Sequence, residues 1–168
     1  MKSKKIILIG MMGSGKTSVG ALLSNKLNFK FLDCDEIFES QNKILIKNFF
    51  SKYGEELFRE KETEILVEAL KKENIVLSTG GGVILKKKNR DLIFSESNTV
   101  VYLSASLVEL NKRLLFDNAR PLLQTNDIQF KLETILKQRD KFYNLAQLKI
   151  NTDNKSIEDV VLEILDSL

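Results

Sequence analysis

The sequence of 168 residues contains no histidine, one cysteine and one proline. Without histidine, a Ser-His-Asp or Cys-His nucleophile and a His-ligated zinc site are excluded. Cys34 has no second cysteine with which to form a disulfide, and one thiolate cannot hold an iron–sulfur cluster. Proton transfer must therefore fall to Asp, Glu, Lys, Tyr or the substrate itself.

Excess charge and long apolar runs are also missing. The net charge of +3 is too small to indicate a nucleic-acid or anionic-membrane partner. No apolar run reaches the roughly 18 residues of a spanning helix. The apolar part of residues 1–13 is short and runs into glycines, which favours a strand over a signal peptide. Since a lone cysteine fits a reducing compartment, we expect a cytoplasmic protein without nucleic-acid or membrane partners, and by default a monomer.

The chain alternates between apolar runs and helical spacing, and its 43% hydrophobic content suffices for one domain over residues 1–168. Strands are expected at 5–9, 30–32, 75–78, 99–103 and 148–151. Helices are expected at 16–27, 37–72, 86–94, 107–116, 127–143 and 156–168. The longest helical stretch should break near Asn42 and Gly54, and Ser156 with Asp159 offers a capping box. This alternation predicts a three-layer α/β/α fold with a five-stranded parallel sheet.

The strongest motif is Gly10–Thr17, GMMGSGKT, which fits G-x-x-x-x-G-K-[ST] at every fixed position. A buried strand precedes it and an amphipathic helix follows it. Such a loop wraps its backbone around a phosphate, with Lys16 reaching the β- and γ-phosphates and Thr17 ligating Mg²⁺. The alternative is a glycine-rich turn with a chance Lys-Thr pair. The Asn-Lys-x-Asp motif of GTP switches is absent, and the strands at 75–78 and 99–103 do not end in the Asp-Glu of many motor ATPases. The chain length and the proline-bearing arginine loop suit a small-molecule kinase better.

Two carboxylates, Asp33 and Asp35, follow the second expected strand. They should lie at the carboxyl end of the sheet, where open α/β sheets bind ligands. One could address Mg²⁺ and the other a substrate hydroxyl. The alternative is a solvated turn with a helix cap at Asp35.

Three glycines in Thr79–Gly82 follow the third strand, which suits either a close approach to the backbone or a tight turn. The chain has only five arginines beside 21 lysines. Arg120 precedes Pro121 in the aperiodic stretch 118–127, where a cation could close over phosphates. Arg59 and Arg139 lie on expected helices and suit a planar carboxylate. Arg90 lies in a basic run and is expected to be solvated.

The ordered set of motifs resembles the shikimate kinase family over essentially the whole chain. The motifs are GMMGSGKT, FLDCD at 31–35, FREKE at 58–62, TGGG at 79–82, RPLL at 120–123 and a late helical Arg139. The resemblance implies ATP-dependent phosphorylation of the 3-hydroxyl of shikimate, with Mg²⁺, on the route to chorismate and the aromatic amino acids. It also implies a P-loop fold with strand order 2-3-1-4-5, a substrate-binding helical region at about 34–62 and a lid at about 116–127.

The same resemblance assigns roles to residues. ATP would be bound by Met12, Gly13, Ser14, Gly15, Lys16, Thr17, Arg113 and the lid residue Arg120. Asp33 would reach Mg²⁺ through water, beside Thr17. Asp35 would hold the shikimate hydroxyls and act as the base, so that the catalytic set is Lys16, Asp35 and Arg120. Shikimate would also be held by the Gly81 backbone N–H and by Arg59 and Arg139 at its carboxylate, with Glu62 orienting Arg59.

The sequence departs from the family pattern at a few positions, and two other functions stay open. Met11-Met12 in the loop and Cys34 between the aspartates depart from the family pattern without removing a charge, and Lys155 leaves the adenine contact of 151–156 open. A kinase of the same fold acting on gluconate or a nucleoside monophosphate is the first alternative. A nucleotide-regulated binding module without chemistry is the second.

Overall fold

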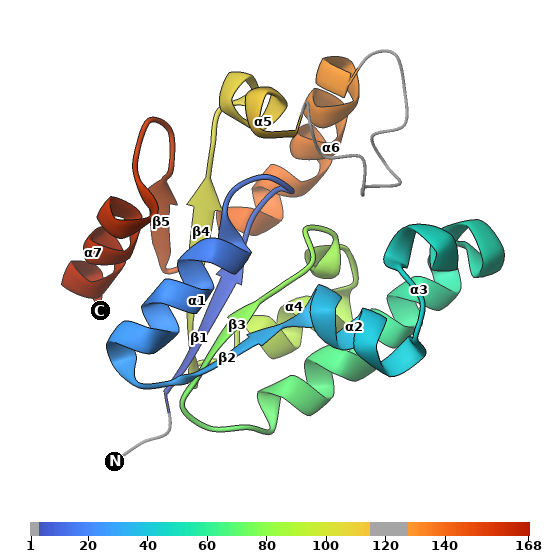
Figure 1. The fold of residues 1–168 in the computed structure, drawn as a ribbon, viewed down its shortest axis with the longest axis horizontal. Helices are drawn as coiled ribbons and strands as arrows, with labels where there is room; N and C mark the ends of the chain where they lie inside the picture. The colour runs from blue at the N-terminus through green and yellow to red at the C-terminus, as the bar shows by residue number, and fades with distance from the viewer. Residues whose placement is uncertain (1–3, 115–127) are drawn as a thin grey trace.

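Five parallel strands form one sheet in the computed structural model, which describes residues 4–114 and 128–168 (Figure 1). The strands are β1 (Lys5–Ile9), β2 (Lys30–Asp33), β3 (Ile75–Ser78), β4 (Asn98–Ser104) and β5 (Leu148–Asn151). Their order in space is β2-β3-β1-β4-β5, and every neighbouring pair is parallel. The expected sheet and strand order are therefore confirmed.

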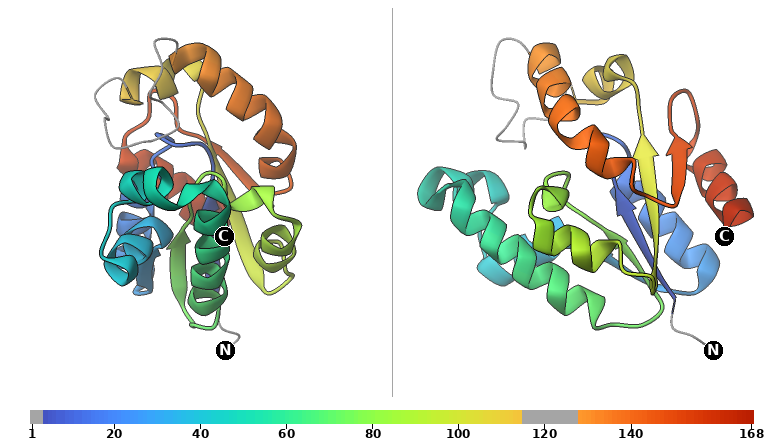
Figure 2. Two further views of the ribbon diagram at one scale, coloured as in Figure 1. Left: turned by 90° about the vertical axis from the view of Figure 1, so that its right-hand side faces the viewer. Right: turned by 180° about the vertical axis from the view of Figure 1, so that it is seen from behind.

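Helices cover both faces of this sheet (Figure 2). They are α1 (Lys16–Leu27), α2 (Cys34–Asn42), α3 (Ile46–Leu70), α4 (Lys87–Ile93), α5 (Leu107–Leu114), α6 (Ile128–Tyr143) and α7 (Ile157–Ser167), with a 3₁₀ turn η1 at Val83–Leu85. Helices α1 and α7 pack on one face, and α3, α4 and α6 lie over the other. No helix in the described part of the chain is both long and apolar enough to span a membrane.

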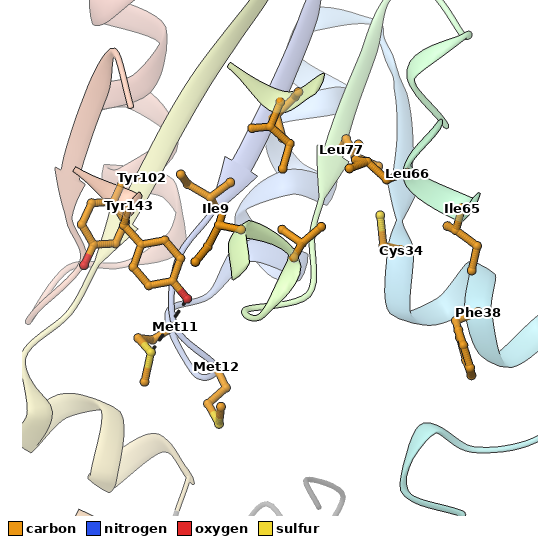
Figure 3. Packing of buried hydrophobic residues seen from close by; sticks show 14 of the residues in the cluster. Ile9, Met11, Met12, Cys34, Phe38, Ile65, Leu66, Leu77, Tyr102 and Tyr143 are labelled. Carbon is orange, nitrogen blue, oxygen red and sulfur yellow. Dashed lines mark hydrogen bonds between the residues drawn. The ribbon is translucent and has the colours of Figure 1, made fainter. Parts of the chain in front are cut away.

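The central strand β1 shows why the sheet is sandwiched. Ile6 and Leu8 pack with the helices α1 and α7, whereas Ile7 and Ile9 pack on the opposite side with residues of α2 to α6. Successive side chains of a strand point to opposite faces, so an uninterrupted apolar run must be covered on both. Figure 3 shows the second of these cores, with Ile9 between Tyr143 on one side and Leu77 on the other.

Individual side chains and one glycine decide where several helices begin and break. Helix α2 begins at Cys34, three residues earlier than expected, because the Asp33 side chain caps its first turn. The long helix α3 breaks at Gly54, whose φ of 82° is open to glycine but strained for other residues. The expected break there is confirmed, as is the capping box of Ser156 and Asp159 at the start of α7.

Candidate active site

The phosphate-binding motif forms the loop between β1 and α1. Gly13 and Gly15 have φ values of 80° and 92°, which only glycine adopts without strain. The Lys16 side chain is buried within the loop, and its ammonium donates to the carbonyls of Gly10 (3.0 Å) and Met11 (2.8 Å). Positive charge and the N-terminus of α1 therefore meet at one point, which is the arrangement that binds phosphate.

Asp33 links this loop to helix α2 through both carboxylate oxygens. Oδ2 accepts a hydrogen bond of 2.7 Å from the Thr17 hydroxyl. Oδ1 accepts from the backbone N–H groups of Asp35 (2.9 Å) and Glu36 (3.3 Å), so Asp33, and not Asp35, caps the helix. The alternative of a solvated turn is wrong, because Asp33 is buried at the end of β2.

Thr17 and Asp33 are suited to Mg²⁺, a hard cation that takes oxygen donors. Mg²⁺ usually binds proteins through one or two carboxylates together with substrate phosphates. In residues 4–114 and 128–168, no group of three or more His, Cys, Asp or Glu side chains could hold a metal by itself. The hydroxyl and carboxylate beside the phosphate loop thus fit the nucleotide-bound form of the ion.

A cavity of about 190 Å³ opens at the carboxyl ends of the strands. It brings together Gly13, Gly15, Lys16, Thr17, Ser18, Asp33, Asp35, Ser78, Thr79 and Gly81. The phosphate loop, both predicted aspartates and the middle glycine of the triple-glycine turn therefore line one space. Parallel strands place their carboxyl ends on one edge, which explains why segments far apart in sequence meet here.

The triple-glycine turn lies against the charged groups of α2 and α3. A Cβ atom at Gly80 would lie 2.8 Å from Glu62 Oε1 and 3.1 Å from Asp35 Oδ1. A Cβ atom at Gly82 would lie 2.5 Å from Nη1 of Arg59. Gly80 therefore makes room for two carboxylates and Gly82 for a guanidinium. The motif predicted a close approach to the backbone, but not which groups approach it.

Arg59 is held by two glutamates of its own helix. Its Nη1 donates to both oxygens of Glu62 at 3.0 and 2.9 Å, which confirms the expected i,i+3 pair. Its Nε and Nη2 also donate to Glu55 Oε1 at 3.2 and 3.1 Å, a second pairing that was not expected from the sequence. Burial raises the pKa of Glu62, and the Arg59 charge opposes that rise.

Arg139 reaches the same turn from α6. Its guanidinium is buried, and Nη1 would lie 3.4 Å from a Cβ atom at Gly81. The Nε is buried and has no hydrogen-bond acceptor among the described residues. Since Arg59 lies against Gly82, two guanidinium groups approach neighbouring glycines of one turn. That pair can receive an anion at the edge of the cavity.

Two other arginines are engaged in structural contacts. Arg113 donates to the Gly13 carbonyl (3.2 Å) and to the hydroxyl (3.1 Å) and carbonyl (2.8 Å) of Thr152, and so joins the phosphate loop to the end of β5. The expectation that Arg90 is solvated is wrong. Its guanidinium donates to two carbonyls of η1 and stacks 4.1 Å from the centre of the Phe142 ring. Arg120 and the expected lid lie outside the described residues.

Cys34 is fully buried between the two aspartates and next to Glu62. Burial, together with these carboxylates, raises the pKa of its thiol. A raised pKa keeps the thiol protonated and so disfavours the reactive thiolate, and Cys34 packs in the core that Figure 3 shows.

The chain is similar in sequence and in fold to proteins of one family. Residues 12–168 match the family model described as shikimate kinase. The shikimate kinase of Legionella pneumophila strain Corby is 38% identical over 169 residues, which cover 100% of this chain and 96% of that protein. The one from Nitrosomonas europaea is 42% identical over 164 residues, covering 97% of this chain and 77% of that protein. The solved structure of shikimate kinase from Acinetobacter baumannii in complex with shikimate matches with a TM-score of 0.94 at 37% identity, covering 98% of this chain and 92% of that one.

Proposed function

Since the chain belongs to the shikimate kinase family, we propose that its site transfers the γ-phosphoryl group of ATP to the 3-hydroxyl of shikimate. The products are shikimate 3-phosphate and ADP, on the route to chorismate and the aromatic amino acids. The chain is an ATP-dependent kinase, and its residues would divide between phosphate binding, activation of the hydroxyl and selection of the alcohol.

Phosphate binding falls to the loop that carries Lys16, together with the backbone of Met12, Gly13, Ser14 and Gly15. The ammonium of Lys16 lies among loop carbonyls, so it is already positioned where the β- and γ-phosphates would be held. Thr17 and Asp33 would hold Mg²⁺ with their adjacent oxygens. The ion would neutralise charge on the phosphate oxygens.

Activation of the alcohol falls to Asp35. Its side chain lines the same cavity as Lys16 and Gly81, so an alcohol in that cavity lies between a carboxylate and the phosphate loop. Asp35 would accept a hydrogen bond from the 3-hydroxyl and take its proton as the P–O bond forms. The Gly81 N–H would bind the substrate beside it. Arg120 would stabilise the negative charge of the transition state.

The observation that supports shikimate most directly is the pair of buried guanidiniums at one turn. Arg59 lies against Gly82 and Arg139 against Gly81, at the edge of the cavity that holds Asp35. A carboxylate that leaves water needs charge-assisted donors, and two planar forks supply them. Glu55 is about half exposed, so it can turn into water and free one edge of Arg59 when a carboxylate arrives.

Further roles would fall to the substrate-binding region, the lid and Arg113. The region 34–62 supplies Asp35 and Arg59 and would be the substrate-binding region, and 116–127 would be the lid. Arg113 would lie near adenine, since it contacts both the phosphate loop and Thr152 at the end of β5. The enzyme would act as a cytoplasmic monomer that binds neither nucleic acid nor membrane.

A coupled ADP-release assay tests the proposal with shikimate, gluconate and nucleoside monophosphates as acceptors. Turnover with shikimate alone is expected. Turnover with gluconate or a nucleotide instead would assign the site to another kinase of this fold, and no turnover with any acceptor would indicate a binding module.

Asp35→Asn should lose most of kcat with a smaller effect on ATP binding. If Asp33→Asn lost all activity while Asp35→Asn retained it, the roles of the two carboxylates would be reversed.

A further inference from the structure

Two stacked tyrosines lie between the sheet and α6, and their hydroxyls point in different directions. The rings of Tyr102 and Tyr143 have centroids 5.0 Å apart at an interplanar angle of 26°. Figure 3 shows the Tyr143 hydroxyl directed toward Met11 and the Tyr102 hydroxyl directed away from it. The Tyr102 hydroxyl instead contacts Asp140 Oδ1 at 3.4 Å. The pair therefore has one common packing role but two separate polar ends.

The polar end of Tyr143 lies among residues of the active site. Its hydroxyl donates a hydrogen bond of 2.5 Å to the Gly81 carbonyl and lies 3.9 Å from the sulfur of Met11 in the phosphate loop. Arg139, one helical turn earlier on α6, reaches the same glycine, and its charge acts on the hydroxyl by opposing the burial that raises the pKa of Tyr143. A phenol has one donor and two acceptor positions, so it can donate to Gly81 and accept from the guanidinium at once.

The buried position of Tyr143 keeps its hydroxyl protonated at neutral pH, so that it can donate to the Gly81 carbonyl. Tyr143 is fully buried, and burial raises the pKa of its hydroxyl to about 12, although the Arg139 charge opposes the rise. The hydroxyl therefore keeps the proton that it donates to Gly81. The Nε of Arg139 has no acceptor among the described residues, so this edge of the guanidinium is not held by a hydrogen bond there.

We propose that Tyr143 is a positioning residue for shikimate, whose hydroxyl holds the Gly81 carbonyl and the Arg139 guanidinium in a common arrangement. This inference rests on the proposed function, because it concerns two groups assigned to shikimate. Tyr143 itself is not among the residues that line the cavity with Lys16 and Asp35. Removing its hydroxyl would take away the donor to the buried Gly81 carbonyl and a polar neighbour of the buried Arg139 guanidinium, and both groups would shift.

The test compares Tyr143→Phe with Tyr102→Phe, because each removes one hydroxyl from the same stacked pair. Steady-state kinetics should give Tyr143→Phe a KM for shikimate raised roughly five- to tenfold, with KM for ATP within about twofold of wild type. Tyr102→Phe should leave both KM values near those of wild type. In an Arg139→Lys background, Tyr143→Phe should raise KM for shikimate by a smaller factor than it does alone, because both changes disturb the same side chain.

Several outcomes would overturn the inference. Equal effects of the two phenylalanine variants, or equal increases in both KM values, would assign Tyr143 to packing alone. If Tyr143→Phe is too unstable for kinetics, the shifts in melting temperature produced by saturating ADP and by saturating shikimate separate the same cases. A retained ADP shift with a reduced shikimate shift supports positioning, and two retained shifts contradict it. Wild type without turnover on shikimate would instead refute the proposed function.

Discussion

Replacing Gly82 by alanine tests whether Arg59 must stay where the structure places it. Gly82 has φ −94° and ψ −2°, a conformation that alanine adopts without strain. The substitution therefore adds one methyl group and leaves the backbone unstrained. That methyl carbon would lie 2.5 Å from Nη1 and 2.6 Å from Cζ of Arg59.

The size of the effect follows from the distances. Ordinary contact begins near 3.4 Å, so the guanidinium must move by about 1 Å. It cannot swing away freely, because Nη1 is paired with both oxygens of the buried Glu62. A displacement of this size in a group that positions the substrate reduces binding by roughly tenfold to a hundredfold, or about 1.4 to 2.8 kcal/mol.

The assay is steady-state kinetics with each substrate varied in turn. Gly82→Ala should raise KM for shikimate by that factor and leave KM for ATP nearly unchanged. In an Arg59→Lys background, Gly82→Ala should raise KM for shikimate by a smaller factor, since the planar guanidinium that the methyl group displaces is gone. A KM for shikimate equal to that of wild type, or a matching increase in both KM values, would refute the steric argument.

Three further predictions concern single charges of the site. Lys16→Ala should abolish turnover while circular dichroism shows a folded protein, and near wild-type kcat would contradict the phosphate role. Arg139→Lys should raise KM for shikimate by roughly tenfold or more, because the charge remains and the planar fork is lost; unchanged shikimate binding by calorimetry would refute this. Since burial raises the pKa of Glu62, its protonation on acidification begins above the ordinary glutamate range and weakens the pair with Arg59. KM for shikimate should therefore rise in that window. Protonation of Glu62 should not lower the melting temperature. A group whose pKa is higher in the folded than in the unfolded state stabilises the fold when it binds a proton. Measuring both quantities between about pH 5 and 8 in wild type and Glu62→Gln checks this, since the variant should lack the rise in KM.

Strands and loop motifs were predicted well because their determinants are local. The strand at Lys5–Ile9 was expected with these bounds, since an uninterrupted apolar run can only be buried on both faces. The beginning of α2 was missed, because sequence alone does not tell whether an aspartate at this point is a metal ligand, a helix cap or a solvated residue. The burial of Asp33 and its bond to Thr17 decide between these.

Contacts of arginine were predicted less well. The pair of Arg59 with Glu62 follows from helical spacing, but its second pair with Glu55 competes with it on the same helix. Arg90 looked solvated because its sequence neighbours are basic, yet its guanidinium stacks on an aromatic ring of α6. The aromatic face and the carbonyls that hold Arg90 come from elements that sequence periodicity cannot bring together.

The sequence by itself determined the fold class and the position of the phosphate loop, because both depend on residue types at short spacing, and it marked the aspartates and arginines as candidate site residues. Only the tertiary structure decided what these groups touch. The hydrogen bond from Tyr143 to Gly81 joins residues 62 positions apart, and the one from Arg113 to Gly13 spans 100. Such contacts exist only once parallel strands have brought their carboxyl ends to one edge and α6 has packed across them. The positions of the active-site side chains are therefore a property of the packed fold.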